Sequence, residues 1–277
     1  MANPSGTERK YANQIIEGWV KATGSTTPRT LADWVADIVS VTAFGAVGDG
    51  VTDDSIAINA AIDRALVLLA AGTPTTVEFP AGIFRYVTAH AAMSYPVSFI
   101  GQGNLKSIIL VDPALTGGHV FGWSEVWEGA PSPSPWPVGT DTVTLANNRA
   151  GVLVSGLTLV GDRDAGATQN GFVFYDAADF VLFHDVSAYY LKGSMIKTGV
   201  TLNAASSFMR ESSFDKIRAW YCGAASAPVL AFGSVGATIA NNEIDFGFVE
   251  MYAPMGDGFV IDAGNLILPH SANIPTK

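Results

Sequence analysis

Acidic side chains that recur at a fixed interval are the first feature of this sequence that could do chemistry. Asp185, Asp215 and Asp245 follow one another at intervals of 30 residues. If each interval is one turn of a stacked structure, their carboxyl groups lie about 5 Å apart and raise one another's pKa. A raised pKa is what a general acid needs to protonate the leaving oxygen of a glycosidic bond. Asp is also a preferred turn residue, so a purely structural role at a repeated corner is the alternative.

A further acid, Glu250, lies in a related repeat. Tyrosines recur every 31 residues, at Tyr190, Tyr221 and Tyr252. In this register Glu250 aligns with Ala219, on the side that we expect to face the core. A buried carboxyl group has a raised pKa, so Glu250 joins Asp215 and Asp245 as a candidate catalytic residue. The alternative is a bulge that shifts the strand and turns Glu250 outward.

Aromatic side chains beside these acids are candidates for substrate binding. Tyr189 and Trp220 lie on the face opposite the expected core, where flat rings can stack on sugars. Arg218 and Trp127 are further candidates for contact with a glycan. Trp127 belongs to residues 122–150, where prolines and serines predict a long loop. The alternatives are a structural aromatic ladder, a subunit interface, and a loop that packs as a flap on the protein.

The elements that must position these residues are short strands. From Gly151 onward, each period of about 30 residues holds three apolar segments, which predicts one turn of a solenoid. The first type of segment reads GLTLVG, DVSAYY, KIRAWY and FVEMY. The sequence therefore predicts an all-β protein whose strands stack in register.

A helix is expected before the repeats. Val41–Leu69 reads as a strand, a turn rich in glycine, and a helix over residues 53–71. Asp53 can accept hydrogen bonds from the first amides of this helix. Apolar residues form a stripe along one side: Ile58, Ala61, Ile62, Ala65, Leu66 and Leu69. A helix with one apolar face is suited to covering the open end of a solenoid.

The wording of this region resembles a known family. FGAVGDGVTDDSIAINAAID, VEFPAGIFRYV and VSFIGQG resemble the opening of the pectate-lyase-3-like proteins, in the pectin lyase-like superfamily. That group includes polygalacturonases and many bacteriophage tailspikes. The resemblance implies a right-handed parallel β-helix over residues 41–277, with a helical cap at its N-terminal end. It says little about chemistry, because this scaffold carries hydrolases, lyases and adhesins.

Residues 1–40 differ from the rest, and we expect helices at Glu8–Thr23 and Thr30–Val39. The phrase TPRTLADWVADIVSV resembles the neck of phage tailspikes, which implies a virion anchor and a trimerising neck. The alternative is a disordered leader followed by one docking helix. No secretory signal is visible, and no cap follows the strand GFVIDAGN, so we expect a portion of a longer spike.

Composition excludes some functions. A net charge of −10, with 15 basic and 25 acidic side chains, argues against a nucleic-acid partner. Four scattered histidines and a single cysteine predict no metal site, and we expect no cofactor and no membrane insertion.

The resemblance therefore implies a homotrimeric phage tailspike that acts at the bacterial surface and contacts tail or baseplate proteins through residues 1–40. It would attach to host polysaccharide and, as a glycosidase or lyase, depolymerise it. The alternatives are a structural or adhesin module without enzymatic activity and a free polygalacturonase-like enzyme.

Overall fold

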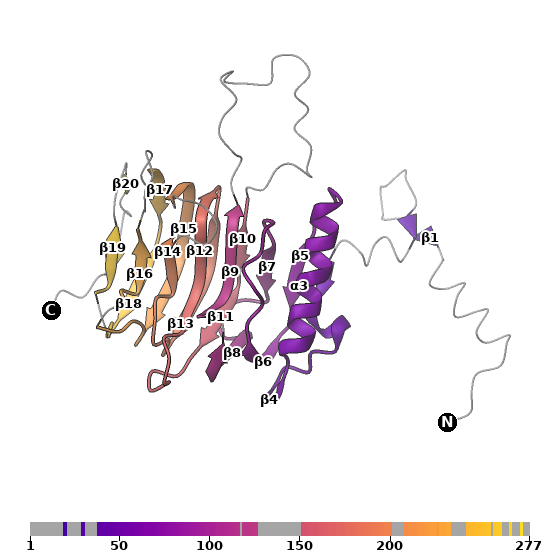
Figure 1. The fold of residues 1–277 in the computed structure, drawn as a ribbon, viewed down its shortest axis with the longest axis horizontal. Coiled ribbons are helices and arrows are strands. Elements are labelled where there is room, and N and C mark those ends of the chain that lie inside the picture. The colour runs from indigo at the N-terminus through magenta and orange to yellow at the C-terminus, as the bar shows by residue number, and fades with distance from the viewer. Residues whose placement is uncertain are drawn as a thin grey trace, which may run out of the picture.

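A computed structural model describes residues 19–20, 29–30, 38–116, 118–126, 151–200, 208–225, 227–233, 242–255, 257–261, 266–267 and 272–273. From Ile38 onward these residues form a right-handed parallel β-helix whose strands follow one another along one axis (Figure 1). The predicted fold class is confirmed. Within the described ranges, no helix is both long enough and apolar enough to span a membrane.

Three parallel sheets form the walls of the solenoid. The first contains β3 (Ile38–Ser40), β5 (Thr76–Phe79), β7 (Ser98–Gly101), β10 (Leu153–Ser155), the start of β13 (Leu182–Tyr189), the middle of β15 (Phe208–Trp220), β17 (Asn242–Phe246) and β20 (Leu266–Ile267). The second contains β4 (Asp49–Asp53), β6 (Gly82–Thr88), β8 (Ser107–Thr116), β11 (Leu157–Val160), the ends of β13 and β15, β18 (Val249–Tyr252) and β21 (Ala272–Asn273). The third contains β9 (His119–Val126), β12 (Asn170–Asp179), β14 (Ile196–Val200), β16 (Leu230–Phe232) and β19 (Phe259–Ile261).

The helix α3 (Ser55–Ala70) closes the N-terminal end of the stack, as predicted. It follows a short 3-10 helix, η1 (Val41–Phe44), and lies beside β5 at the end of the solenoid (Figure 1). Its apolar side is buried in the common core through Ala57, Ile58, Ala61, Ile62 and Ala65. The Asp53 carboxylate accepts a hydrogen bond from the Ser55 amide at 3.0 Å, which satisfies one free donor at the helix start.

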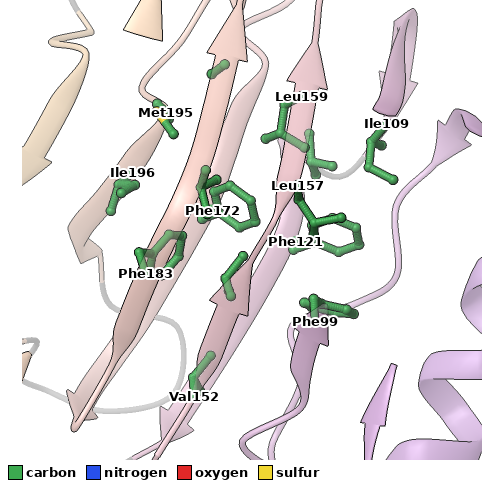
Figure 2. Close-up of a cluster of buried hydrophobic side chains, with 14 of the residues drawn as sticks. Phe99, Ile109, Phe121, Val152, Leu157, Leu159, Phe172, Phe183, Met195 and Ile196 are labelled. Carbon is green, nitrogen blue, oxygen red and sulfur yellow. The ribbon is translucent and has the colours of Figure 1, made fainter. Parts of the chain in front are cut away.

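Aromatic side chains from successive turns stack along the interior. Phe99 and Phe121 lie 4.4 Å apart between ring centroids, and Phe172 and Phe183 lie 5.0 Å apart (Figure 2). Trp123 is fully buried and stacks on Phe174 at 4.8 Å. The predicted start of the loop at residue 122 is therefore wrong, because β9 continues to Val126 and carries Trp123 into the core.

The helices predicted in residues 1–40 are wrong wherever the structure describes this region. Two short strands, β1 (Trp19–Val20) and β2 (Arg29–Thr30), pair in antiparallel fashion. Ile38–Ser40 pairs with β5, where the β-branched Ile38 and Val39 suit a pleated sheet. The other residues of these two predicted helices lie outside the described residues.

A single residue in the left-handed conformation turns the chain between the first and second sheets in consecutive turns of the solenoid. This residue is Gly156 (φ 66°), then Asp185 (φ 54°), then Lys216 (φ 54°). In the next turn two residues, Gly247 and Phe248, lie between β17 and β18. The extra residue changes the spacing between paired residues on the second sheet, and this change determines which side chains face outward.

Candidate functional site

The candidate site is the outer face of the second sheet, on the last parts of β13 and β15 and on β18. Two rows of side chains run across these strands in register. The charged row is Ser187, Arg218 and Glu250, and the aromatic strip is Tyr189, Trp220 and Tyr252. The residues between the two rows, Ala188, Ala219 and Met251, are buried in the core. Alternation along each strand therefore places both rows on the outside.

Glu250 does not face the core as predicted. It pairs with Arg218 rather than Ala219, and 30% of its side chain is exposed. The cause is the extra residue between β17 and β18, because a shift of one residue moves a strand's side chains to the opposite face. The alternative of a local irregularity that turns Glu250 outward describes the structure. The same shift pairs Tyr252 with Trp220.

The predicted stack of three aspartates is wrong. Asp185 occupies a corner position, and the residue in its register in the next turn is Lys216, which also has a positive φ. Asp215 pairs with His184, and Asp245 pairs with Ser213. The interval of 30 residues does not match the pairing interval between β13 and β15, which is 31. The three carboxyl groups therefore lie at different positions along their turns.

Asp215 is held by its neighbours in the ionised form. Its carboxylate accepts a hydrogen bond from the Phe248 amide at 3.0 Å and lies 3.3 Å from Nδ1 of His184. The bond from the Phe248 amide lowers the pKa of Asp215, because it favours the charged carboxylate. A general acid needs the opposite shift. Asp245 is exposed on the first sheet, away from the charged row.

Arg218 is the centre of the charged row. Its Nη1 donates a hydrogen bond to Asp185 at 3.0 Å, and its Nε lies 3.9 Å from a carboxylate oxygen of Glu250. The guanidinium also lies 5.9 Å from the centre of the Phe248 ring. Arg218 thus links two carboxylates from neighbouring turns, with 27% of its side chain exposed.

The aromatic strip presents three rings along the axis of the solenoid. Tyr189 and Trp220 are 5.8 Å apart between ring centroids, and Trp220 and Tyr252 are 5.3 Å apart. Tyr252 is 52% exposed. Beside the strip, the rings of Tyr190 and Tyr221 stack at 5.3 Å and 8°, so the predicted tyrosine ladder is confirmed for these two members.

Two buried polar atoms at this face have no hydrogen-bond partner among the described residues. They are Oγ of Ser187, in the charged row, and Nε1 of Trp220, in the aromatic strip. Burial without a partner is costly for a hydroxyl or an indole N–H. Sequence reasoning missed Ser187, because a single serine between apolar residues carries no signal of this kind.

The structure thus brings together four of the predicted site residues and separates the others. Tyr189, Arg218, Trp220 and Glu250 share one face, whereas Asp215 lies before the adjacent corner and Asp245 lies on the first sheet. Trp127 lies outside the described residues. A group of at least three His, Cys, Asp or Glu side chains able to hold a metal ion is absent from the described part of the chain.

Comparison with known proteins agrees with this architecture. Residues 38–158 match the family model for rhamnogalacturonase A/epimerase, pectate lyase-like proteins. The resemblance to pectate lyase-like proteins is confirmed. A search of curated proteins found no match.

Two solved structures share the tailspike-like fold at low sequence identity. ORF18 of Geobacillus virus E2 is 17% identical with a TM-score of 0.59, and the match covers 85% of this chain and 43% of that one. WceF of Pantoea stewartii, a glycan biofilm modifying enzyme with a bacteriophage tailspike-like parallel β-helix fold, is 17% identical with a TM-score of 0.60. That match covers 88% of this chain and 32% of WceF, so the chain spans less than half the length of either protein. Identities this low establish the fold alone.

Proposed function

We propose that this protein is part of a phage tailspike and binds a polysaccharide of the bacterial surface on the outer face of its second sheet. The observation that carries the proposal is the aromatic strip of Tyr189, Trp220 and Tyr252 beside the charged row. Aromatic rings offer apolar faces for sugar rings, and the neighbouring polar groups can hydrogen-bond to sugar hydroxyls. The strip runs along the solenoid axis, so consecutive sugars of one chain can contact consecutive turns.

The geometry favours binding over cleavage. Glycoside hydrolysis needs a carboxylic acid with a raised pKa and a second carboxylate beside the same bond. Here the Phe248 amide lowers the pKa of Asp215. Arg218 contacts both Asp185 and Glu250, and a nearby cation favours their charged forms. We therefore propose an adhesin that holds the glycan without cutting it, and we treat depolymerisation as an outcome to be tested.

The wider context is proposed by analogy with the structural neighbours. Both proteins have parallel β-helices, one comes from a virus, and the other has a fold described as tailspike-like. We propose a homotrimer in the phage tail, attached to tail or baseplate proteins through residues 1–40. Light scattering measures the assembly state directly, and a monomer would remove the proposal of a trimer.

The binding proposal is tested with immobilised capsular and O-antigen polysaccharides and the wild-type chain, Trp220→Ala and Phe44→Ala. Phe44 is a matched control because it is an aromatic residue, 39% exposed, next to the cap helix. We expect Trp220→Ala to weaken binding about tenfold, since a lost aromatic contact costs roughly 1 kcal/mol or more. Phe44→Ala should bind as the wild type does. No binding to any glycan, or equal binding by both variants, would contradict the proposal.

The same samples distinguish an adhesin from an enzyme. After incubation, new reducing ends would indicate cleavage, and absorbance of an unsaturated uronate would indicate a lyase. Binding with neither product is the result that we expect. Products that disappear in Glu250→Gln would replace the adhesin with a depolymerase.

A further inference from the structure

The charges on the outer face of the second sheet bear on which glycan it can take. Arg218 is the cation of the charged row, and its guanidinium already contacts Asp185 at 3.0 Å and Glu250 at 3.9 Å. A guanidinium that binds an acidic sugar normally offers two parallel N–H groups to the sugar carboxylate. The contacts with two carboxylates of the protein leave Arg218 poorly placed for that role.

The remaining charges near Arg218 are also mainly acidic. Asp215 lies before the same corner, and its charge is opposed by the exposed Lys216 and by His184, which contacts it at 3.3 Å. Three carboxylates thus face one guanidinium and one ammonium, and an additional carboxylate from a sugar would meet like charges. Like charges at close range destabilise a complex, most strongly when the contact excludes water.

The unpaired polar atoms of this face indicate a ligand with hydroxyl groups. Ser187 is fully buried, its Oγ has no partner among the described residues, and Nε1 of Trp220 shares this property. A hydroxyl of a sugar can accept a hydrogen bond from either group and donate one to Glu250. Because both atoms are covered in the unbound state, small rotations of the neighbouring side chains must accompany binding.

We infer that the aromatic strip and the charged row take an uncharged segment of polysaccharide, and that uronic acid residues are disfavoured there. This inference rests on the proposed function and adds the class of sugar to it. One nearby cation works in the opposite direction. Arg163 is exposed and lies close enough to Tyr221 to influence its ionisation, at the edge of the face next to the strip. The experiment therefore includes this residue.

The test uses a panel of bacterial polysaccharides that contain uronic acids, each measured before and after chemical reduction of its carboxyl groups to primary alcohols. Reduction removes the charge and keeps the linkages, so each pair is matched. We expect the reduced form to bind about tenfold more tightly at low salt. Glu250→Gln should narrow this difference, because it removes one negative charge while keeping the shape of the side chain.

The outcomes separate this inference from the proposed function. Tighter binding of the unreduced forms would overturn the inference, and loss of that preference in Arg163→Ala would assign it to Arg163. Binding that does not respond to Trp220→Ala would place the glycan elsewhere and overturn both. No binding to either form of any polysaccharide in the panel would also overturn both.

Discussion

At the level of single residues, Arg218 determines the character of the site. It connects Asp185, at a corner, with Glu250, in the following turn. Neither contact could be predicted from the sequence, because each depends on the register between strands. The type of residue was informative: Arg218, Trp220 and Tyr189 were predicted to contact a glycan, and all three lie on one face.

Asp215 gives a prediction for the dependence of stability on pH. Its pKa is lower in the folded chain than in the unfolded chain, so its contribution is present above the unfolded pKa. That contribution is lost as the pH falls through the folded pKa. We expect Asp215→Asn to lower the free energy of unfolding at neutral pH and to have a smaller effect in strong acid.

Urea unfolding at several pH values measures this effect, with Asp245→Asn as the matched control. Asp245 is an exposed aspartate one turn further along, in register with Ser213. An equal response to acid in the two variants would contradict the role assigned to the Phe248 amide.

Cys222 gives a prediction about reactivity. Burial raises the pKa of its thiol to about 12, so little thiolate is present at neutral pH. We expect a thiol reagent to leave the folded protein unmodified and to label Cys222 rapidly in denaturant. Rapid labelling without denaturant would show that the turn after β15 is open in solution.

At the level of elements, the corner between the first and second sheets offers a matched comparison. Gly156 and Lys216 occupy the same corner in different turns, both with positive φ. A Cβ at Gly156 would lie 2.7 Å from the carbonyl oxygen of Gly101, a contact that the backbone cannot relieve cheaply.

We therefore expect Gly156→Ala to lower the free energy of unfolding by about 2 kcal/mol or more. Lys216→Gly should be neutral or stabilising by up to about 1 kcal/mol, because glycine adopts positive φ without strain. Chemical denaturation of both variants tests this pair. Equal destabilisation would mean that conformation at the corner does not limit stability.

The elements also show how far the sequence could be interpreted. The apolar stripe of residues 53–71 predicted α3 within two residues at its start and one at its end. The period of about 31 residues predicted the pairing of β13 with β15. The orientation of Glu250 could not be predicted, since Tyr221 and Trp220 are adjacent aromatics and Tyr252 fits a ladder with either. One extra residue at Gly247–Phe248 decides between these registers.

At the level of the whole molecule, the solenoid converts a sequence repeat into rows of side chains on its surface. Stacked turns bring Tyr189, Trp220 and Tyr252 into one strip, although they are distant in the sequence. The interior holds a matching column of phenylalanines, for example Phe183 and Phe214 at 5.4 Å. A rigid core of this kind fixes the spacing of the outer rows, which is what a binding surface for a repeating polymer requires.

The central claim is that a glycan lies on the aromatic strip, and footprinting by hydroxyl radicals tests it most directly. The wild-type chain is oxidised with and without the polysaccharide that binds it best, and modified residues are quantified by mass spectrometry. We predict that glycan protects Tyr252 and Trp220 from oxidation and leaves the exposed Phe44 and Phe180 unchanged. Unchanged oxidation of Tyr252 and Trp220 in the saturated complex would contradict the account.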